Sequence, residues 1–360
     1  MAAPVAKPGP RGLPAGGAGR ILGAGEPGIE EMAEMTAVPK ARSAGRSARA
    51  ERSARPARPV PPARPAPRLG EFAVRPQPGD PRLTRRLKGV DQEGNEIETV
   101  VVVERPLTLF LNGQEIVTMM TVGDHPDYLA VGYLLNQNML RPDDEITAIE
   151  HDEELELVVV RTKRRTDYEA KLKRKTRTSG CAQGTVFGDL MEKFDDVRLP
   201  KDAVIKTSWL YALAKKINTS PSLYLEAGAI HGCVLCEEDR PLVYMEDVGR
   251  HNAIDKIAGY MFVNAVSPEG KIFYTTGRLT SEMVIKCVQM RIPILISRSG
   301  FTAWGVELAE KADLTLIGRA KGRRFTALAG THRIVYDADP HAVSAESRAA
   351  RRKSSLPDEE

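Results

Sequence analysis

The first part of the chain carries the alternating pattern of β-strands. In "RPLTLFLNGQEIVTMMT", residues 105–121, apolar and polar positions largely alternate on both sides of Asn112-Gly113. An Asn-Gly pair between two such runs predicts two antiparallel strands joined by a tight turn. Residues 154–162, "ELELVVVRT", predict a further strand. Between them, residues 127–140 place apolar side chains at helical spacing, so we expect a β-rich part that includes one helix.

A different pattern fills the second part of the chain. The stripe of Ile205, Trp209, Leu213 and Ile217 predicts a helix. Beyond it, an apolar strand, a glycine-containing turn and a helix follow one another three times, and a last strand and turn complete the pattern. These units span residues 241–262, 271–290, 292–312 and 314–325. Strands that alternate with helices predict an α/β fold, here a mixed sheet flanked by helices.

The order of these units also indicates where chemistry belongs. In layered α/β domains, ligands bind at the loops that follow the strands. This rule selects residues 247–252, 276–281, 298–302 and 318–324 as candidate site loops.

Composition separates the ends of the chain from its folded part. Residues 1–85 are rich in Ala, Pro, Arg and Gly and poor in β-branched and aromatic residues, so we expect a disordered extension. An arginine-rich transit peptide is the alternative, although several glutamates and prolines count against it. The expected domain covers residues 86–340, with a β-rich part at 86–180 and an α/β part at 181–340. Residues 341–360 are expected to form a flexible tail.

Charge and hydropathy exclude some classes of partner. The net charge of +4 comes from an excess of Lys and Arg in the first 80 residues, so the basic balance is poor evidence for nucleic-acid binding by the folded part. No apolar run is long enough for a membrane span, and the N-terminus lacks the apolar core of a secretory signal. We therefore expect a cytoplasmic protein that binds neither nucleic acid nor membrane.

Three of the selected loops carry side chains suited to an anionic ligand. "EDVGRHNAIDK", residues 246–256, gathers acidic, basic and amide groups at one strand-to-helix turn, more than helix capping needs. Arg278 in "TTGRLTSEMVIK" can form a bidentate contact with a phosphate. "GRAKGRR", residues 318–324, surrounds a glycine with cationic groups. The alternative for each loop is a capped helix or turn with solvated charges.

The four cysteines differ in their surroundings. Cys233 and Cys236 follow His231 at a metal-like spacing, but the segment has the pattern of a strand, which favours two core thiols over a metal or redox site. Cys287 lies on the apolar stripe of a predicted helix. Cys181 instead follows a run of Lys and Arg within "RTSGCAQG", where positive charge and exposure favour the reactive thiolate. An accidental loop cysteine is the alternative.

Several of these segments together resemble the formate dehydrogenase accessory sulfurtransferase family (FdhD). The resemblance spans about residues 90–340, and its segments are "ERPLTLFLNG", "DYLAVGYLL", "RTSGCAQG", "GAIHGC", "EDVGRHNAIDK", "TGRLTSEMVIKCVQMRIPIL" and "LTLIGRAKGRRF". It implies a cytidine-deaminase-like fold and, typically, a homodimer.

The resemblance also implies an activity. Such a sulfurtransferase passes sulfur from a cysteine desulfurase, through a persulfide on Cys181, to the molybdenum cofactor bis-molybdopterin guanine dinucleotide. The sulfurated cofactor is required for formate dehydrogenase activity. By the resemblance, the turn at residues 318–324 lies in the region that holds the cofactor, while the other candidates come from loop chemistry. The candidate cofactor-binding residues are Gly318, Arg319, Ala320, Lys321, Gly322, Arg323, Arg324, Arg278, His231, Asp247, Arg250, His251 and Asn252.

One departure from the family pattern bears on the mechanism. Members often carry Cys-x-x-Cys on the cysteine loop, whereas Gly184 stands at the second position here. A persulfide needs only one attacking thiolate, so Cys181 alone can carry the sulfur. Two alternatives stay open, namely a non-catalytic chaperone that binds the cofactor for formate dehydrogenase, and a metalloenzyme built on His231, Cys233 and Cys236. A zinc hydrolase of the deaminase type is disfavoured because no glutamate follows His231 at the required spacing.

Overall fold

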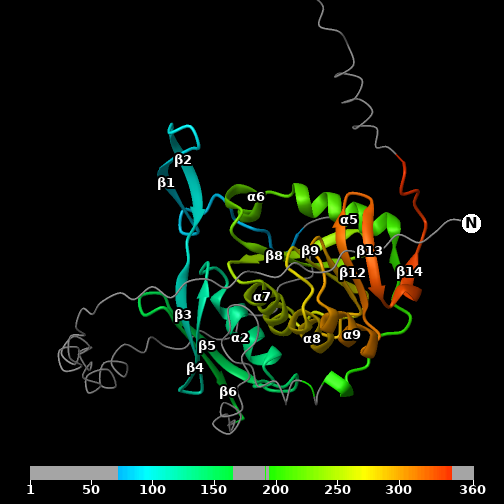
Figure 1. Ribbon diagram of the computed structural model, residues 1–360. Coiled ribbons are helices and arrows are strands. Elements are labelled where there is room, and N and C mark those ends of the chain that lie inside the picture. The colour runs from blue at the N-terminus through cyan, green and yellow to red at the C-terminus, as the bar shows by residue number, and fades with distance from the viewer. Residues whose placement is uncertain (1–71, 165–190, 192–193, 343–360) are drawn as a thin grey trace, which may run out of the picture. The chain divides into compact units, whose positions relative to one another are not determined.

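The computed structural model describes residues 72–164, 191 and 194–342. The helices and strands, labelled as in Figure 1, are β1 (Thr84–Val90), β2 (Glu96–Val102), β3 (Arg105–Leu111), β4 (Gln114–Thr121), α2 (Pro126–Asn136), β5 (Ile146–Asp152), β6 (Leu157–Thr162), β7 (Ile205–Lys206), α5 (Thr207–Thr219), α6 (Leu223–Ala227), β8 (His231–Glu237), β9 (Arg240–Asp247), α7 (Arg250–Val263), β10 (Lys271–Thr275), α8 (Ser281–Gln289), β11 (Ile294–Ser297), α9 (Ala303–Lys311), β12 (Thr315–Lys321), β13 (Arg324–Ala329) and β14 (Ile334–Val335). No helix in these ranges is long and apolar enough to cross a membrane.

The central element is a six-stranded sheet with the order β13-β12-β11-β10-β8-β9. Strands β10, β11 and β12 run parallel, because each is joined to the next by a helix. Strands β8 and β9 form an antiparallel hairpin that pairs with β10, and β13 closes the other side as an antiparallel edge strand. The predicted mixed α/β architecture is confirmed.

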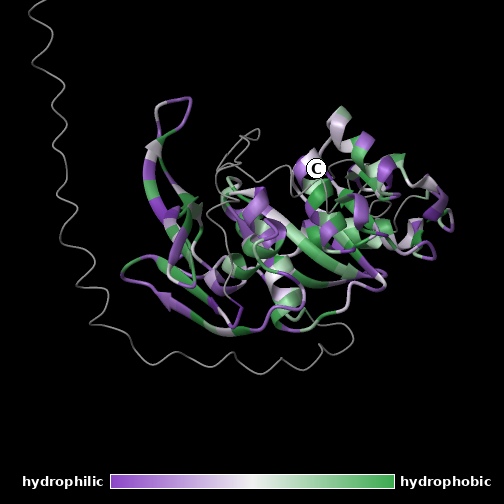
Figure 2. Ribbon diagram, turned by 90° about the horizontal axis from the view of Figure 1, so that it is seen from below, coloured by the Kyte–Doolittle hydropathy of each residue, from purple (hydrophilic) through white to green (hydrophobic). Residues whose placement is uncertain are grey.

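Helices cover both faces of this sheet. Helices α7, α8 and α9 pack on one face, where Ile254, Met283 and Leu308 share a buried cluster with strand residues. Helix α5 covers the opposite face with Leu213 and Ile217. Figure 2 shows hydrophobic segments concentrated in the central strands and the adjoining helices. The resulting three layers bury both faces of the parallel strands, as their nearly continuous apolar sequences require.

The thiols of the second part belong to these cores. Cys233 lies in the α7 layer and Cys236 in the α5 layer, because side chains separated by an odd number of positions point to opposite faces of a strand. Cys287 on α8 is fully buried as well. The interpretation of all three as core thiols is confirmed. Ile205, expected on the helical stripe, instead belongs to β7, which pairs with β14 before α5 begins.

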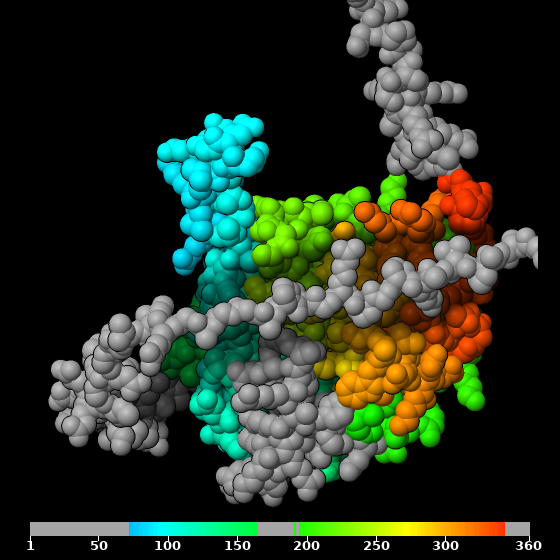
Figure 3. Space-filling model, viewed as in Figure 1, coloured from blue at the N-terminus to red at the C-terminus, as the bar shows by residue number. Residues whose placement is uncertain are grey.

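The N-terminal β-rich part is a four-stranded sheet with the order β4-β3-β6-β5, covered by α2. The predicted hairpin joins β3 to β4, and both turn residues have positive φ, 53° at Asn112 and 101° at Gly113. Such angles explain the Asn-Gly pair, since these two residues tolerate the left-handed region best. Strands β1 and β2 form a separate ribbon that projects beside this sheet and is largely exposed (Figure 3).

Residues 72–85 are part of the fold, so the fold begins earlier in the chain than the predicted boundary between residues 85 and 86. Val74 is buried and forms a parallel bridge with Val243 on the edge strand β9. Leu83 is buried beside Leu223 and Ile230. These few apolar residues find partners far along the chain, so the boundary inferred from the surrounding composition lies too late for residues 72–85.

The two parts meet where α2 crosses α7 at a very short distance. A Cβ atom built on Gly132 would lie 1.7 Å from the Asp255 carbonyl oxygen, and one on Gly259 would lie 1.9 Å from that of Tyr128. Two glycines thus allow the helix backbones to touch. Beside the crossing, the buried Asp255 carboxylate accepts hydrogen bonds from Asn136 of α2 at 2.7 Å and Lys286 of α8 at 2.7 Å.

We predict that Gly259→Ala lowers the free energy of unfolding by about 3 kcal/mol or more, because the methyl group must force the two helices apart. Chemical denaturation monitored by circular dichroism measures the change. Gly89→Ala on the exposed β1 strand is the matched control, since no atom lies within 4 Å of the added methyl group. Equal stabilities for the two variants would contradict the tight crossing.

Candidate functional site

The candidate loops meet at one edge of the six-stranded sheet. Strands β9, β10 and β11 end there and β8 begins there, since His231 pairs with Asp247, and Thr275 pairs with both Cys233 and Ser297. Strand β12 runs parallel to β11 and extends beyond it at the same edge. With neighbouring strands about 4.8 Å apart, β9 and β12 are separated by roughly 20 Å.

At the β9 end of this edge, Asp247 is fully buried and satisfied by protein groups. Its carboxylate lies 2.6 Å from Lys256 Nζ and accepts hydrogen bonds from Thr121 Oγ1 at 2.5 Å and from Asn252 Nδ2 at 3.0 Å. Asn252 also donates to the Met120 carbonyl at 2.7 Å. Asp247 and Asn252 therefore fix the turn before α7 to β4, and the fold places their polar groups against protein.

Lys256 of α7 completes the set of contacts around Asp247. It is fully buried and also bonds to Asp124 and to the Glu246 carbonyl. Although burial disfavours its charge, Asp124 and Asp247 hold the pKa of Lys256 above its usual range. The lysine is therefore a charged structural group at neutral pH.

Four other predicted residues form what we call the edge cluster: His231, Arg250, His251 and Arg278. They come from the start of β8, the first turn of α7 and the loop after β10. Burial lowers the pKa of His231, and Arg250 and Arg278 lower it further. Burial also lowers the pKa of His251, although Glu282 opposes this. Both imidazoles are therefore mainly neutral at pH 7.

The polar atoms of the two histidines are incompletely paired. Within the described residues, the Nδ1 atoms of His231 and His251 are buried and have no hydrogen-bond partner. The Nε2 atom of His251 lies 3.0 Å from the Glu282 carboxylate. Buried polar atoms without partners are uncommon and costly, which is typical of groups kept for a ligand or a proton.

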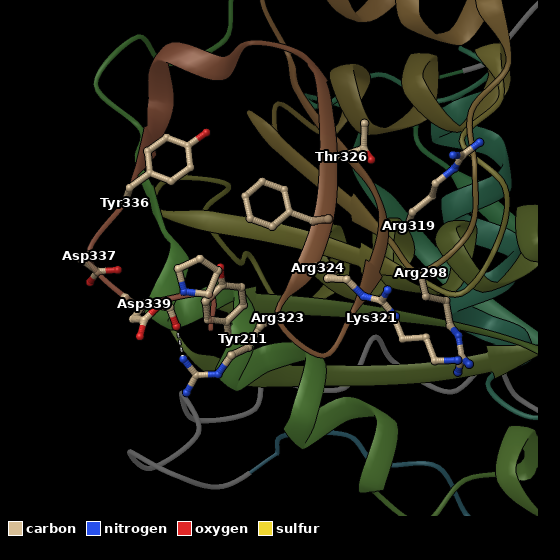
Figure 4. A pocket seen from close by; sticks show the side chains of 13 residues that line it. Tyr211, Arg298, Arg319, Lys321, Arg323, Arg324, Thr326, Tyr336, Asp337 and Asp339 are labelled. Atoms are coloured by element: carbon tan, nitrogen blue, oxygen red, sulfur yellow. Dashed lines mark hydrogen bonds between the residues drawn. The ribbon is translucent and has the colours of Figure 1, made fainter. Parts of the chain in front are cut away.

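A basic pocket of about 1050 Å³ lies at the other end of the edge (Figure 4). Its lining residues are Tyr211, Arg298, Arg319, Lys321, Arg323, Arg324, Phe325, Thr326, Tyr336, Asp337, Ala338, Asp339 and Pro340. Five cationic side chains and three aromatic rings line one hollow, a combination that suits a ligand with both phosphates and a flat ring system.

A bulge in β12 presents two of the five cations of the pocket, Arg319 and Lys321. The pairing with β13 is irregular between Gly318 and Lys321, and Arg319 has a φ of 54°. A residue other than glycine in this region is strained, and bulges commonly redirect a side chain next to a site. Arg319 and Lys321 are exposed on one side, whereas Ala320 between them is buried in the core.

This geometry corrects the expected turn at residues 318–324. Gly318 to Lys321 belong to strand β12, and the turn consists of Gly322 and Arg323 alone. A Cβ atom on Gly318 would lie 2.5 Å from the Phe301 ring, so this glycine serves packing rather than a turn. The pattern of glycines and arginines predicts a turn here because a bulged strand has the same composition.

Arg298 lies in the predicted site loop 298–302 but is absent from the predicted cofactor-binding residues, as are the aromatic residues Tyr211, Phe325 and Tyr336 of the pocket. Arg298 donates to Asn218 Oδ1 at 3.1 Å, and its guanidinium stacks 5.1 Å from the ring of Tyr224. Arg323 stacks over Tyr211 at 5.4 Å. Arg298 could have been found, because it begins one of the selected strand-end loops. Tyr211 could not, since it lies on a helix whose outer face gives no signal of a site.

Two of the sequence predictions lie outside the described residues. Cys181 and Gly184 belong to the segment 165–190, so the proposed carrier thiol has no structural description. Within the ranges that are described, no group of His, Cys, Asp and Glu side chains could hold a metal ion. The described edge thus offers cationic anion-binding groups and neutral histidines that could exchange protons.

Comparison with known proteins identifies relatives over most of this fold. Residues 102–335 match the FdhD/NarQ family. The sulfur carrier protein FdhD of Wolinella succinogenes is 31% identical over 233 residues, which cover 64% of this chain and 80% of that protein. The sulfur carrier protein FdhD of Bacillus subtilis is 30% identical over 251 residues, covering 67% of this chain and 93% of that protein.

A solved structure agrees with this result. The crystal structure of a protein from Desulfotalea psychrophila, named a formate dehydrogenase accessory protein, is similar with a TM-score of 0.58 and 26% identity. The match covers 70% of this chain and 100% of that one. The matched region, residues 102–335, contains the edge cluster and the cationic residues of the basic pocket. Because this match covers more than half of the chain, the chain belongs to the FdhD/NarQ family.

Proposed function

We propose that this chain is a sulfur carrier that moves sulfane sulfur from a cysteine desulfurase to bis-molybdopterin guanine dinucleotide, for use by formate dehydrogenase. The observation that carries the proposal is the basic pocket, which lies on one sheet edge with the edge cluster in a chain whose relatives are named sulfur carriers. The cofactor is cargo in this function, so no resident metal is needed.

The loading step requires one thiolate. Cys181 attacks the outer sulfur of a persulfide on the desulfurase. The bond between the two sulfurs of the donor breaks, its electron pair stays on the donor cysteine as a thiolate, and Cys181 becomes the persulfide. No net oxidation occurs. The run of Lys and Arg before Cys181 favours its thiolate form, the reactive species.

Delivery requires the cargo to accept sulfur as sulfide. When the outer sulfur passes to a reduced metal centre, its bond to Cys181 breaks and Cys181 leaves as a thiolate. The metal supplies the two electrons that convert sulfane sulfur to a bound sulfide. The protein's part is to hold the cargo, and the pocket offers Arg298, Arg319, Lys321 and Arg324 for its phosphates.

The pocket also favours a nucleotide over a simple anion. Tyr211, Phe325 and Tyr336 provide ring faces beside the cations, and Tyr211 already stacks against Arg323. A guanine base can stack on such surfaces while its phosphates contact the arginines. A chaperone that binds the cofactor without carrying sulfur would use the same pocket, so the two functions differ only in their need for Cys181.

The carrier role predicts that Cys181 is the one thiol that gains sulfur. After incubation with a cysteine desulfurase and cysteine, intact-mass spectrometry of the wild-type chain should show the addition of sulfur, and peptide mapping should place it on Cys181. Cys181→Ser should show none and should fail to support formate dehydrogenase activity in cells that lack the endogenous accessory protein. Cys287→Ala is the control, since Cys287 is buried and should affect stability alone.

Full formate dehydrogenase activity with Cys181→Ser would contradict the carrier role and favour the chaperone. Sulfur found on Cys233 or Cys236 would overturn the assignment of the carrier residue.

The pocket assignment predicts that loss of a cation weakens nucleotide binding. With GDP as the probe, Arg319→Ala and Lys321→Ala should each raise Kd by about tenfold, since a charge-assisted hydrogen bond contributes about 1.5–3 kcal/mol. Added salt should weaken wild-type binding. Isothermal titration calorimetry measures both effects. Arg85→Ala, on the exposed β1–β2 ribbon, is the matched control. If Arg319→Ala and Lys321→Ala bind GDP as tightly as the wild type and the control do, the pocket does not hold the nucleotide.

A further inference from the structure

One cation of the basic pocket, Arg298, is held in place by two side chains that do not line the pocket. Its guanidinium lies over the ring of Tyr224, with the central carbon 5.1 Å from the ring centroid. Its Nη1 donates a hydrogen bond to Asn218 Oδ1 at 3.1 Å. A guanidinium is attracted to the negative face of an aromatic ring, so both contacts restrict its position. The proposed function gives Tyr224 and Asn218 no role.

The two supporting residues are themselves fixed by the fold. Glu246 of β9 is buried, and its carboxylate accepts a hydrogen bond from the backbone N–H of Tyr224 at 2.9 Å, which fixes the first turn of α6. On α5, Asn218 Nδ2 donates to a carbonyl of its own helix at 2.6 Å. This bond orients the amide so that its oxygen is the atom that faces Arg298. The position of the guanidinium therefore depends on α5, α6 and β9.

These contacts leave one edge of the guanidinium available. Tyr224 occupies a face and Asn218 occupies Nη1, whereas Nε and Nη2 have no hydrogen-bond partner within the part of the chain that the structure describes. The same pair of donors forms a bidentate contact elsewhere in this fold, where Arg161 Nε and Nη2 bind the Glu150 carboxylate at 3.0 and 3.1 Å. Two parallel N–H donors match two oxygens of a phosphate as well as those of a carboxylate.

Three other cations of the pocket lack such support. Arg319, Lys321 and Arg324 are exposed, and no hydrogen bond or ion pair among the described residues holds their side chains. A long side chain that is free in the empty pocket loses rotamer freedom when it contacts a ligand, and this loss reduces the affinity that the contact provides. Arg298 has already lost much of that freedom, so the same contact from Arg298 contributes more to binding.

We propose that Arg298 is the preorganised phosphate-binding group of the basic pocket, and that Tyr224 and Asn218 are positioning residues that present its Nε–Nη2 edge to the ligand. The proposal rests on the proposed function, because it concerns how the same pocket holds its nucleotide. It predicts that two residues outside the lining of the pocket control nucleotide affinity through Arg298.

The first test compares cations, with the full chain, GDP as the probe and isothermal titration calorimetry as the measurement. Arg298→Ala should raise Kd by about 30-fold, more than the roughly tenfold expected for Arg319→Ala, because the contact of Arg298 costs less ordering. Arg298→Lys should lose most of the same affinity, since an ammonium keeps the charge but not the paired donors. Wild-type affinity in Arg298→Lys would overturn the bidentate contact.

The second test separates positioning from structural support. Tyr224→Leu should raise Kd for GDP by about fivefold, whereas Tyr224→Phe, which keeps the ring face, should bind as the wild type does. In the Arg298→Ala background Tyr224→Leu should change Kd by less than about twofold, because the group that it positions is gone. Phe72→Leu is the matched control, since it removes a ring that lies 5.3 Å from the Arg75 guanidinium outside the pocket.

The possible results have different consequences. Unchanged affinity in Tyr224→Leu, or an equal loss in Tyr224→Phe, would overturn the role of the ring and leave the pocket assignment intact. A loss of the same size with and without Arg298 would show that Tyr224 only supports the fold, and would also overturn the proposal. If Tyr224→Leu fails to fold, Asn218→Ala decides in the same cycle, with an expected rise in Kd of about threefold. If the wild type does not bind GDP, the pocket assignment itself fails.

Discussion

The buried ion pair of Lys256 and Asp247 is the interaction on which the arrangement of the site depends. Both side chains are fully buried, and a lone charge in that place would carry a desolvation cost of several kcal/mol. Asp124 joins the pair from the loop before α2, and Thr121 joins it from β4. Three elements from both parts of the fold are therefore held to the end of β9, where α7 begins.

This anchoring explains why, within the described part of the chain, the Nδ1 atoms of His231 and His251 can stay without hydrogen-bond partners. Arg250 and His251 follow the anchored turn directly, so their backbone is fixed by Asp247 and Asn252 rather than by their own side chains. The close α2–α7 crossing at Gly132 and Gly259 holds the remainder of the helix. Because other residues fix the backbone, these side chains do not have to stabilise the fold and can instead bind a ligand. Such a division of roles is typical of functional sites.

Much of the fold could be predicted from the sequence because it follows from local pattern. The Asn112-Gly113 hairpin and the alternation of strands and helices depend on side-chain spacing and turn chemistry within short segments. What the sequence did not reveal depends on distant partners. From the sequence, Asp247 is a candidate ligand group. In the fold its carboxylate already contacts Lys256 and Thr121, which the sequence places far from each other. Likewise, the burial of Val74 depends on its bridge to β9, and the β12 bulge at Arg319 depends on the pairing with β13.

The surroundings of the cysteines bear on the chemistry of a carrier with one loop thiol. A second nearby thiol could attack a persulfide to form a disulfide and release hydrogen sulfide, and Gly184 removes the local residue that would do so. The other three thiols are buried, and burial raises the pKa of Cys233 to about 12 and that of Cys287 further. A thiol at such a pKa is almost never a thiolate at neutral pH and so cannot attack. Under the proposed function, a persulfide on Cys181 therefore has no competing nucleophile among the described thiols, and it would persist until the cargo arrives.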